Sequence, residues 1–270
     1  MAVGTQAGMA QKQNRDTLDT GKVYKIDEVV VTGTRSETDV RHLSQTVSVV
    51  GRTKISQAMQ PSLLPVLTEQ IPGLFVTSRG VMGYGVSGGA AGSISLRGLS
   101  GGAARLMVMI DGHPQYAGIF GHPIADAYQS FLAERVEVLR GPASVLYGSN
   151  AMGGVVNIVT RSMQQDGVNT HLRAGYGSYN TLETELTNRI RKGRFSSVVS
   201  ASYNRTDGHR ADMGFEQYSS YAKLGYALTD NWKLRGDVNV THFNASYPGP
   251  VTAPLLDGDQ RITRGMTSFA

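Results

Sequence analysis

The side chains best suited to binding a metal complex are two histidines in one loop, His113 and His122. An imidazole can bind haem iron or contact a ferric complex, because a neutral ring nitrogen is a good metal ligand. Histidines at this spacing in a loop are more commonly ordinary polar residues, so both interpretations stay open. Nothing else in the sequence resembles a nucleophile with its base or a cage of metal ligands. We therefore predict that the chain is not an enzyme and carries no cofactor.

A glycine-rich stretch, SRGVMGYGVSGGAA (residues 78–91), contains the spacing Gly83-x-Gly85-x-x-Gly88 of a dinucleotide-binding loop. That motif requires a strand before it, a helix after it and an acidic residue about 20 positions further on. A strand-like segment does precede the stretch, but Gly-Gly-Ala-Ala-Gly and a second strand follow it. We therefore reject a nucleotide site and interpret the stretch as a loop.

Composition narrows the class of protein. The 270 residues carry a formal net charge of +5 and a pI of about 9.4, and the charges are scattered, which does not favour nucleic-acid binding. Cysteine is absent, so a disulfide framework and a thiolate metal site are excluded. No run of about 18 apolar residues occurs, which excludes a transmembrane helix. The strands of a membrane barrel give a much weaker signal and remain possible.

Short strands and helices must position these loops. The best-defined segment is ERVEVLRGPASVLYGSNAMGGVVNIVTR (residues 134–161), which begins with a strand of alternating polar and apolar residues. A short helix over residues 143–147 follows, and Gly153-Gly154 turns the chain into a second strand, residues 155–160. Further strands are predicted at residues 46–50, 74–76, 93–98 and 106–110, and helices at residues 53–59, 62–70 and 124–132. This is the pattern of a small α+β domain.

The same segment closely resembles the end of the plug domain in TonB-dependent outer-membrane transporters. That family's pattern is a Glu-Arg-Val-Glu strand, Arg-Gly-Pro, a small helix ending in Tyr-Gly, and then Gly-Gly-Val-Val-Asn-Ile, all of which stand between residues 134 and 158. Ile71-Pro72-Gly73, Leu96-Arg97-Gly98 and Ile110-Asp111-Gly112 are similar to further plug motifs. The resemblance implies an α+β plug domain, a small mixed sheet with short helices, over residues 33–165.

The resemblance also implies an energy-coupling partner. Residues 26–32 resemble the TonB box, the segment that TonB engages in the periplasm, and an extended segment can add as a strand to a partner's sheet edge. The alternative is that this run forms the first strand of the plug sheet. The residues implied to contact the periplasmic domain of TonB are Asp27, Glu28, Val29, Val30, Val31 and Thr32.

Two further groups of residues receive roles from the resemblance. Arg97 and Arg140 would pair with barrel glutamates and hold the plug in the lumen, because removing one member of a buried ion pair is costly. The alternative is that both are surface side chains. The two apical loops would contact the substrate through Arg79, Tyr84, His113, Tyr116, Phe120 and His122.

From residue 166 the pattern changes to long strands that alternate apolar and polar residues. Such strands, joined by connections that are short at one end and long at the other, are typical of an outer-membrane β-barrel, whereas a soluble β-sandwich is the alternative. We predict that residues 166–270 form the first four to five antiparallel strands of a transmembrane barrel. Because the lumen of this family takes roughly 22 strands, the chain is expected to be a fragment. The predicted strands cover residues 170–177, 181–190, 195–203, 218–228 and 232–242.

The N-terminal residues 1–25 are polar and are predicted to be disordered. The small residues Ala7-Gly8-Met9-Ala10 suit the cleavage site of a signal peptide, so this segment can also hold a signal-peptide remnant.

The function implied by the resemblance is that of a receptor in a Gram-negative outer membrane, embedded in lipid with its plug inside the barrel lumen. It would bind a scarce metal complex (ferric siderophore, haem or cobalamin) and import it with energy delivered through TonB. Residues 246–257 resemble the cobalamin-receptor branch. However, Asp207, Asp212 and Glu216 are few for that branch's calcium site, since calcium takes about six to eight oxygens. The alternative is a non-transporting outer-membrane adhesin or colicin-type receptor.

Overall fold

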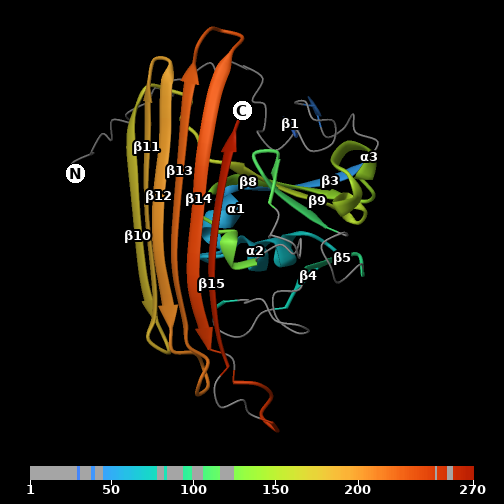
Figure 1. The fold of residues 1–270 in the computed structure, drawn as a ribbon, viewed down its shortest axis with the longest axis vertical. Coiled ribbons are helices and arrows are strands. Elements are labelled where there is room, and N and C mark those ends of the chain that lie inside the picture. Colours follow the sequence, from blue (N-terminus) through green and yellow to red (C-terminus); the bar gives the residue numbers. More distant parts are fainter. Residues whose placement is uncertain are drawn as a thin grey trace, which may run out of the picture.

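The structure is a computed structural model that describes residues 29–30, 38–39, 45–77, 82–83, 94–98, 106–115, 125–246, 248–253 and 258–270. It has two parts, a mixed α+β domain and a six-stranded antiparallel sheet. The domain lies against one face of the sheet, which curves past it as a wall (Figure 1).

The α+β domain is built on a five-stranded sheet of order β3-β8-β9-β6-β7. Neighbouring strands are antiparallel except β6 and β9, which run parallel. Apolar side chains on both faces of the central strands are buried, because one core cluster covers each face. The strands are β3 (Thr46–Gly51), β6 (Met107–Ile110), β7 (His113–Pro114), β8 (Ala133–Arg140) and β9 (Gly154–Thr160).

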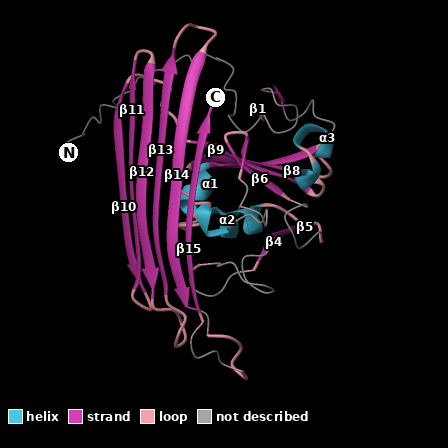
Figure 2. Ribbon diagram, in the orientation of Figure 1, coloured by secondary structure: helices cyan, strands magenta, loops and turns pink. Residues whose placement is uncertain are grey.

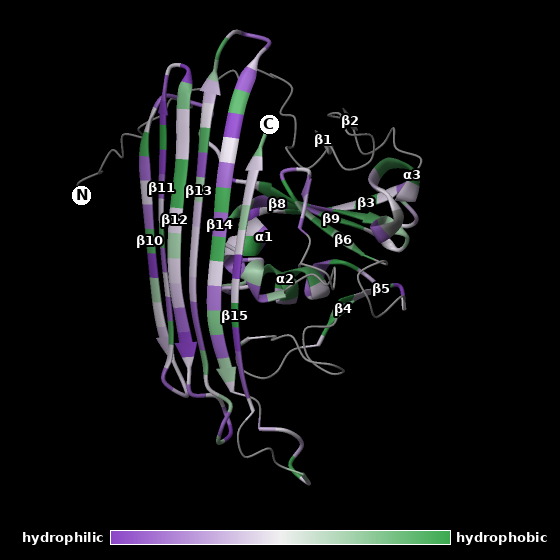
Figure 3. Cartoon of the chain, viewed as in Figure 1, coloured by the Kyte–Doolittle hydropathy of each residue, from purple (hydrophilic) through white to green (hydrophobic). Residues whose placement is uncertain are grey.

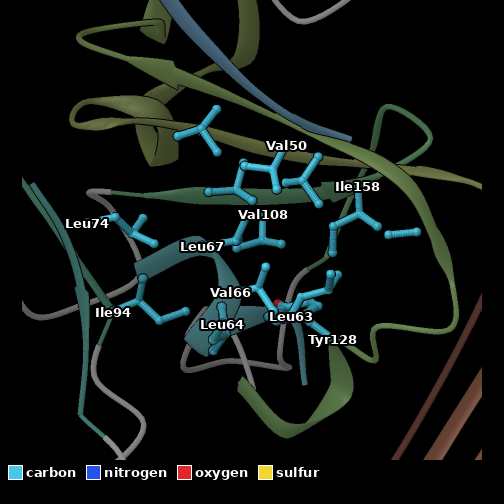
Figure 4. Close-up of a cluster of buried hydrophobic side chains, with 14 of the residues drawn as sticks. Val50, Leu63, Leu64, Val66, Leu67, Leu74, Ile94, Val108, Tyr128 and Ile158 are labelled. Atoms are coloured by element: carbon cyan, nitrogen blue, oxygen red, sulfur yellow. The ribbon is translucent and has the colours of Figure 1, made fainter. Parts of the chain in front are cut away.

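Two helices close the larger core. In α2 (Leu63–Gln70) the hydroxyl oxygen of Ser62 accepts a hydrogen bond from the backbone of Leu64 at 3.4 Å, which caps the helix. Its apolar face packs with α1 (Arg52–Gln57) beneath the sheet, and the side chains converge as Figure 4 shows. The short strands β4 (Leu74–Val76) and β5 (Ile94–Leu96) pair with each other and add Leu74, Val76, Ile94 and Leu96 to the same core.

The segment around residues 134–161 folds as the sequence predicts, with β8, a short helix α3 (Ser144–Tyr147), a 3₁₀ turn (Ser149–Ala151) and β9. Gly154 begins β9 with a φ of 150°, a conformation that favours glycine. A Cβ at this position would lie 2.4 Å from the carbonyl oxygen of Leu139 and 2.8 Å from Cδ2 of Leu96. Only glycine therefore lets β9 approach β8 so closely here.

The second part is a single sheet of six strands, in which each strand pairs antiparallel with the next along the chain (Figure 2). The regular register places every other side chain on the face toward the α+β domain. The strands are β10 (Gly167–Gly177), β11 (Thr181–Lys192), β12 (Phe195–Thr206), β13 (Phe215–Ala227), β14 (Lys233–Ser246) and β15 (Asp259–Phe269).

The two faces of this sheet differ in polarity, which appears as alternating bands along the strands in Figure 3. The face toward the domain is rich in polar side chains, including Thr187, Asn204 and Gln217, which are buried. The opposite face carries exposed apolar side chains: Leu172, Leu186, Val199, Leu224, Leu234, Val238 and Val240. A soluble β-sandwich would have its apolar face covered by a second sheet, so the structure favours the barrel prediction.

Two sequence predictions are wrong in detail. Residues 124–132 were expected to form a helix, but of these only Ala125–Ala127 form a 3₁₀ turn. The chain instead pairs with the segment before α2: Leu63 N donates to Tyr128 O, and Ser130 N donates to Pro61 O. The sheet also has a sixth strand, β15, in place of the four to five expected, because residues beyond the last predicted strand pair with β14.

Near the N-terminus, the backbone of β1 (Val29–Val30) pairs antiparallel with β2 (Thr38–Asp39). Both two-residue strands lie above the five-stranded sheet in Figure 3. Among the described residues, no helix is long and apolar enough to cross a membrane.

Candidate functional site

The candidate site is the contact between the α+β domain and the six-stranded sheet, and its best-formed part surrounds Asp111. This residue occupies the tight turn after β6, and one carboxylate oxygen accepts a hydrogen bond from the backbone of Thr160 at 2.8 Å. The other oxygen accepts bonds from the Thr160 hydroxyl (2.6 Å) and from the Lys223 ammonium of β13 (2.8 Å). Lys223 also donates to the Thr160 hydroxyl at 2.6 Å, and Tyr221 donates to the same atom at 3.5 Å. We call Asp111, Thr160, Tyr221 and Lys223 the ion-pair cluster.

Burial makes the ion-pair cluster electrostatically strong. The Asp111 side chain is 6% exposed and the Lys223 side chain 14% exposed. Burial alone would raise the pKa of Asp111, but the Lys223 charge and the hydrogen bonds from Lys223 and Thr160 outweigh it, so the pKa is lowered. Asp111 is therefore ionised at neutral pH and joins the domain to the sheet as a charged pair.

A second contact is made of amides. The Gln129 side chain donates to the Gln217 side chain of β13 at 3.2 Å, and Gln217 donates in turn to the carbonyl of Asp126 at 2.5 Å. Asn204 of β12 donates to Gln129 at 3.5 Å. Gln129, Asn204 and Gln217 are all buried. The segment that departs from the predicted helix thus supplies the domain's side of this amide cluster.

A third polar contact joins β15 to the edge of the domain. Arg264 donates to the side-chain oxygen of Gln115 at 2.8 Å, and both residues are buried. Gln115 is held in place because its backbone N–H donates to Val108 at 2.8 Å and its side chain donates to His113 at 3.1 Å. The unexpected sixth strand therefore takes part in docking the domain.

One apolar contact lies near the loop end of the sheet. Phe215, Phe243 and Ala245 form a buried cluster against which Met82 packs. Gly83 lies so close that a Cβ there would be 2.5 Å from Cδ2 of Phe215. The glycine-rich stretch, in the part that the structure describes, therefore contacts the sheet directly.

The contact is looser beside β10 and β11. Arg161 approaches Glu185 of β11 at 4.0 Å, and burial together with the neighbouring charges of Arg52 and Arg189 lowers the pKa of Arg161 to about 10. A cavity of about 650 Å³ lies between α1 and these strands, lined in part by Arg52 and Arg173. The domain is thus fastened to β12–β15 more closely than to β10 and β11.

Few of the predicted site residues enter these contacts. Arg97 is exposed in the turn after β5, where its backbone N–H donates to Gly73 at 2.7 Å. Arg140 ends β8, and its buried Nε has no hydrogen-bond partner among the described residues. His113 is half-buried in β7. The pairing of Arg97 and Arg140 with barrel glutamates, and the contact of His113 with a substrate, stay predictions.

The remaining predicted positions lie outside the described residues. They are the substrate candidates Arg79, Tyr84, Tyr116, Phe120 and His122 and the TonB candidates Asp27, Glu28, Val31 and Thr32. For the other two TonB candidates, Val29 and Val30, the structure gives only the backbone pairing with β2.

Sequence reasoning missed most of the residues that join the two parts. Asp111 directly follows the predicted strand 106–110 and Lys223 lies within the predicted strand 218–228, but nothing in the sequence paired them. The available signal was a lysine at an inward position of a barrel strand, where a buried cation needs a partner. Gln129 and Gln217 gave no signal, since both are ordinary polar residues in their segments.

A known protein family and several solved structures share this arrangement. Residues 39–155 match the TonB-dependent receptor plug domain family. This match confirms the predicted plug domain, and members of this receptor family are transporters rather than enzymes. Receptors of this family lie in Gram-negative outer membranes, which is the location predicted for this chain.

Solved structures share the fold of the plug and the sheet. The alcaligin outer-membrane receptor FauA of Bordetella pertussis has a TM-score of 0.65 at 21% identity, over 90% of this chain and 38% of that one. The ferripyoverdine receptor of Pseudomonas aeruginosa has a TM-score of 0.64 at 21% identity, over 80% of this chain and 27% of that one. The ferric yersiniabactin receptor FyuA of Yersinia pestis has a TM-score of 0.58 at 23% identity, over 74% and 32%.

These likenesses establish the fold, namely a plug followed by the first strands of a receptor barrel. The chain spans well under half of the length of each of these receptors. All three are siderophore receptors by description, and the resemblance to a cobalamin receptor gains no support from them.

Proposed function

We propose that this chain, which carries a TonB-dependent receptor plug domain, is the N-terminal part of an outer-membrane receptor that imports a ferric siderophore. The observation that supports it most is the docking of the plug, by buried polar side chains, on one face of a sheet whose other face is apolar. A sheet with this polarity suits a barrel with lipid outside and a plugged, polar lumen inside.

The energy for import would be delivered through TonB at residues 26–32. Among the described residues, the backbone of Val29 and Val30 pairs only with the two-residue strand β2. Two antiparallel pairs are a weak attachment, because a short isolated pairing is marginally stable in water. A partner that offered a longer sheet edge could therefore displace β2 and bind the segment as an added strand.

A ferric siderophore is favoured over haem and cobalamin for two reasons. The receptors that share the fold are described as siderophore receptors. Asp207, Asp212 and Glu216 are few for the calcium site of the cobalamin-receptor branch, and the described residues hold no cluster of three or more potential metal ligands. The apical residues Arg79, Tyr84 and His113 would contact the anionic groups of the complex, together with Tyr116, Phe120 and His122.

Uptake by cells tests the proposal. A strain deleted for the full-length gene should lose growth on limiting iron with one supplied ferric siderophore, and uptake of radioactive iron from that complex should fall to background. Val30→Pro should abolish uptake while leaving surface binding of the complex intact, because proline removes a backbone donor from the segment. Asp39→Ala, which keeps the backbone donor of β2, is the matched control and should transport normally.

The outcome separates the two classes of receptor. Normal growth and uptake in the deletion strain over a panel of ferric siderophores would contradict import and favour the adhesin or colicin-type receptor. If the deletion strain instead fails to grow on haem or cobalamin, the protein is still a transporter, and haem or cobalamin replaces the siderophore as its proposed substrate.

A further inference from the structure

A cavity of about 650 Å³ separates helix α1 of the plug from strands β10 and β11. Small-molecule sites usually measure about 300–1,000 Å³, so this space is large enough for a metal complex of moderate size. Arg52 and Ser56 line it from α1. Because β10 is an edge of the six-stranded sheet, the cavity also reaches round to outward residues of that strand, Leu172, Ala174 and Tyr176.

The strand register places this cavity beside the docking contacts of the plug, at the same height in the sheet. Gln217 of β13 is aligned with Asn204 of β12. Asn204 is aligned with Glu183 of β11, and Glu183 with Gly175 of β10. Gln217 and Asn204 are hydrogen-bonded to Gln129 of the plug, whereas Glu183 and Gly175 line the cavity. The plug therefore contacts β12 and β13 directly and leaves a space in front of β10 and β11.

The inward face of β10 carries only glycine toward the turn that joins it to β11. Arg173 lies opposite Glu185, which approaches the plug, so Arg173 points inward and residues 175 and 177 share its face. Among the described residues, a Cβ at Gly177 would meet nothing within 4 Å, and one at Gly175 would meet only the Glu183 side chain at 4.0 Å. Further along the strand, Arg173 donates to Glu183 at 3.1 Å. The wall is thus open at this end and polar beyond it.

Away from that opening, the cavity is bounded by the loose ion pair between Arg161 and Glu185. Nη1 of Arg161 lies 4.0 Å from Oε1 of Glu185, too far for a hydrogen bond, although each side chain is only 9% exposed. These two atoms and Nε of Arg161 have no hydrogen-bond partner in the part of the chain that the structure describes. The contact between Asp111 and Lys223, by contrast, is 2.8 Å long. The Arg161–Glu185 pair can therefore separate without losing a hydrogen bond between its members.

We propose that the imported metal complex passes through the receptor between α1 and β10–β11, with this cavity as its binding site and the Arg161–Glu185 pair as a gate at the inner end. We call the cavity and the gate together the β10 passage. The lining carries two guanidinium and two carboxylate groups, so it suits a polar chelate that both donates and accepts hydrogen bonds. The inference rests on the proposed function, which supplies the cargo and the direction of transport.

The β10 passage lies where an opening requires the least disruption. On β12, β13 and β15 the plug is held by buried hydrogen bonds of Asp111, Gln129 and Gln115. An opening on that side must break these bonds first. A displacement of α1 away from β10 and β11 instead widens a space that already exists.

The first test narrows the β10 passage in the full-length receptor, expressed in the deletion strain. Gly175→Trp fills the cavity from β10 and Ser56→Trp fills it from α1, so a folding defect in one variant does not decide the result. Each should reduce iron uptake from the supplied ferric siderophore to the background of the deletion strain, while surface binding of that complex stays unchanged. The matched control is Ala201→Trp, which should import normally because Ala201 is exposed on the outward face of β12.

The second test opens the gate and needs no siderophore. Arg161→Ala with Glu185→Ala should make cells sensitive to a hydrophilic glycopeptide antibiotic that is too large for porins, because the inner end of the β10 passage is then open. Adding Gly175→Trp to this variant should restore resistance. The matched control is Asp166→Ala with Arg191→Ala, which should stay resistant. It removes an ion pair of similar length, 3.8 Å, that is more exposed and does not line the cavity.

The outcomes separate this inference from the proposed function. Iron uptake at the wild-type rate in both Gly175→Trp and Ser56→Trp would overturn the β10 passage, as would an equal loss of uptake in Ala201→Trp. Continued resistance of the double alanine variant at the gate would overturn the gate. Antibiotic entry that Gly175→Trp blocks, together with normal iron uptake in the deletion strain, would refute the proposed function and leave the β10 passage standing.

Discussion

The ion-pair cluster gives the sharpest test of how the plug is held. Replacing Lys223 by methionine keeps most of the volume and removes the charge that faces Asp111. Deleting one member of a buried ion pair costs about 3–5 kcal/mol, because the remaining charge stays buried without its partner. We expect the lower end of that range, about 3 kcal/mol, since both Thr160 hydrogen bonds to Asp111 remain and Lys223 is 14% exposed.

A double-mutant cycle separates the pair from its surroundings. Asp111→Asn alone should cost about 2 kcal/mol through lost charge-assisted bonds. The loss of unfolding free energy in the double variant should be about 2 kcal/mol smaller than the sum of the losses in the two single variants. The reason is that the double variant leaves no unpaired charge buried. Lys192→Met is the control, since Lys192 lies on the outward face of the same sheet.

The measurement is urea unfolding of the plug inside the full-length receptor. Val145 in α3 is fully exposed and the 270 residues contain no cysteine, so Val145→Cys can carry a fluorophore that reports on the plug. A Lys223→Met variant that unfolds at the urea concentration of the control, or a cycle with no coupling, would refute the argument that this pair holds the plug.

The lowered pKa of Asp111 predicts how the unfolding free energy of the plug depends on pH. The pKa of Asp111 is lowered in the folded protein, so the stability that it contributes is present above the unfolded value of about 3.9 and is lost as the pH falls through the folded value. The wild-type plug should therefore undock as the pH falls below about 4. Asp111→Asn should lose part of this dependence, and an unchanged profile would contradict the assignment.

Further substitutions probe three other parts of the fold. Gly154→Ala should destabilise the plug by more than about 3 kcal/mol, because the new Cβ would meet the Leu139 carbonyl, and thermal unfolding measures this. Gly83→Ala should detach Met82 and Gly83 from the sheet and raise proteolysis there, and Phe215→Ala should restore part of the protection. Gln129→Ala and Gln217→Ala should each cost about 1–3 kcal/mol in urea unfolding but less than additively together, because they share one amide cluster.

The regular parts of the fold could be predicted from the sequence. Alternation of apolar and polar residues in the predicted strand 218–228 puts Lys223 and Leu224 on opposite faces, and in the structure Lys223 points to the plug and Leu224 is exposed on the other face. The alternation arises because one face of a barrel strand contacts lipid and the other faces the lumen. β15 was missed since its outward positions, including Arg261 and Thr263, carry no apolar stripe. It is a strand because the edge of β14 supplies its hydrogen-bond partners.

Tertiary contacts account for the rest of what was missed. Residues 124–132 have the composition of a helix, but their backbone bonds go to Pro61 and Leu63, which no local pattern reveals. The ion pair joins residues 112 positions apart, so its register depends on how the whole plug sits on the sheet. The local sequence pattern predicts which face of a strand a side chain occupies. Its contact partner in the plug depends on the tertiary structure.

The chemistry of the docking surface fits a plug that must rearrange. Most of its contacts are hydrogen bonds and ion pairs, and the best formed are made by Asp111, Gln129 and Gln115 from the plug. When such contacts break in a hydrated lumen, water replaces the lost partners, so each costs only about 0.5–1.5 kcal/mol net. Separating an apolar interface would instead cost about 25 cal/mol for each Å² of apolar surface exposed to water. The apolar contact at Phe215 lies at the loop end, opposite the end near which β1 lies in Figure 1. A pull on residues 26–32 would therefore load the ion-pair cluster before it reached the contact at Phe215.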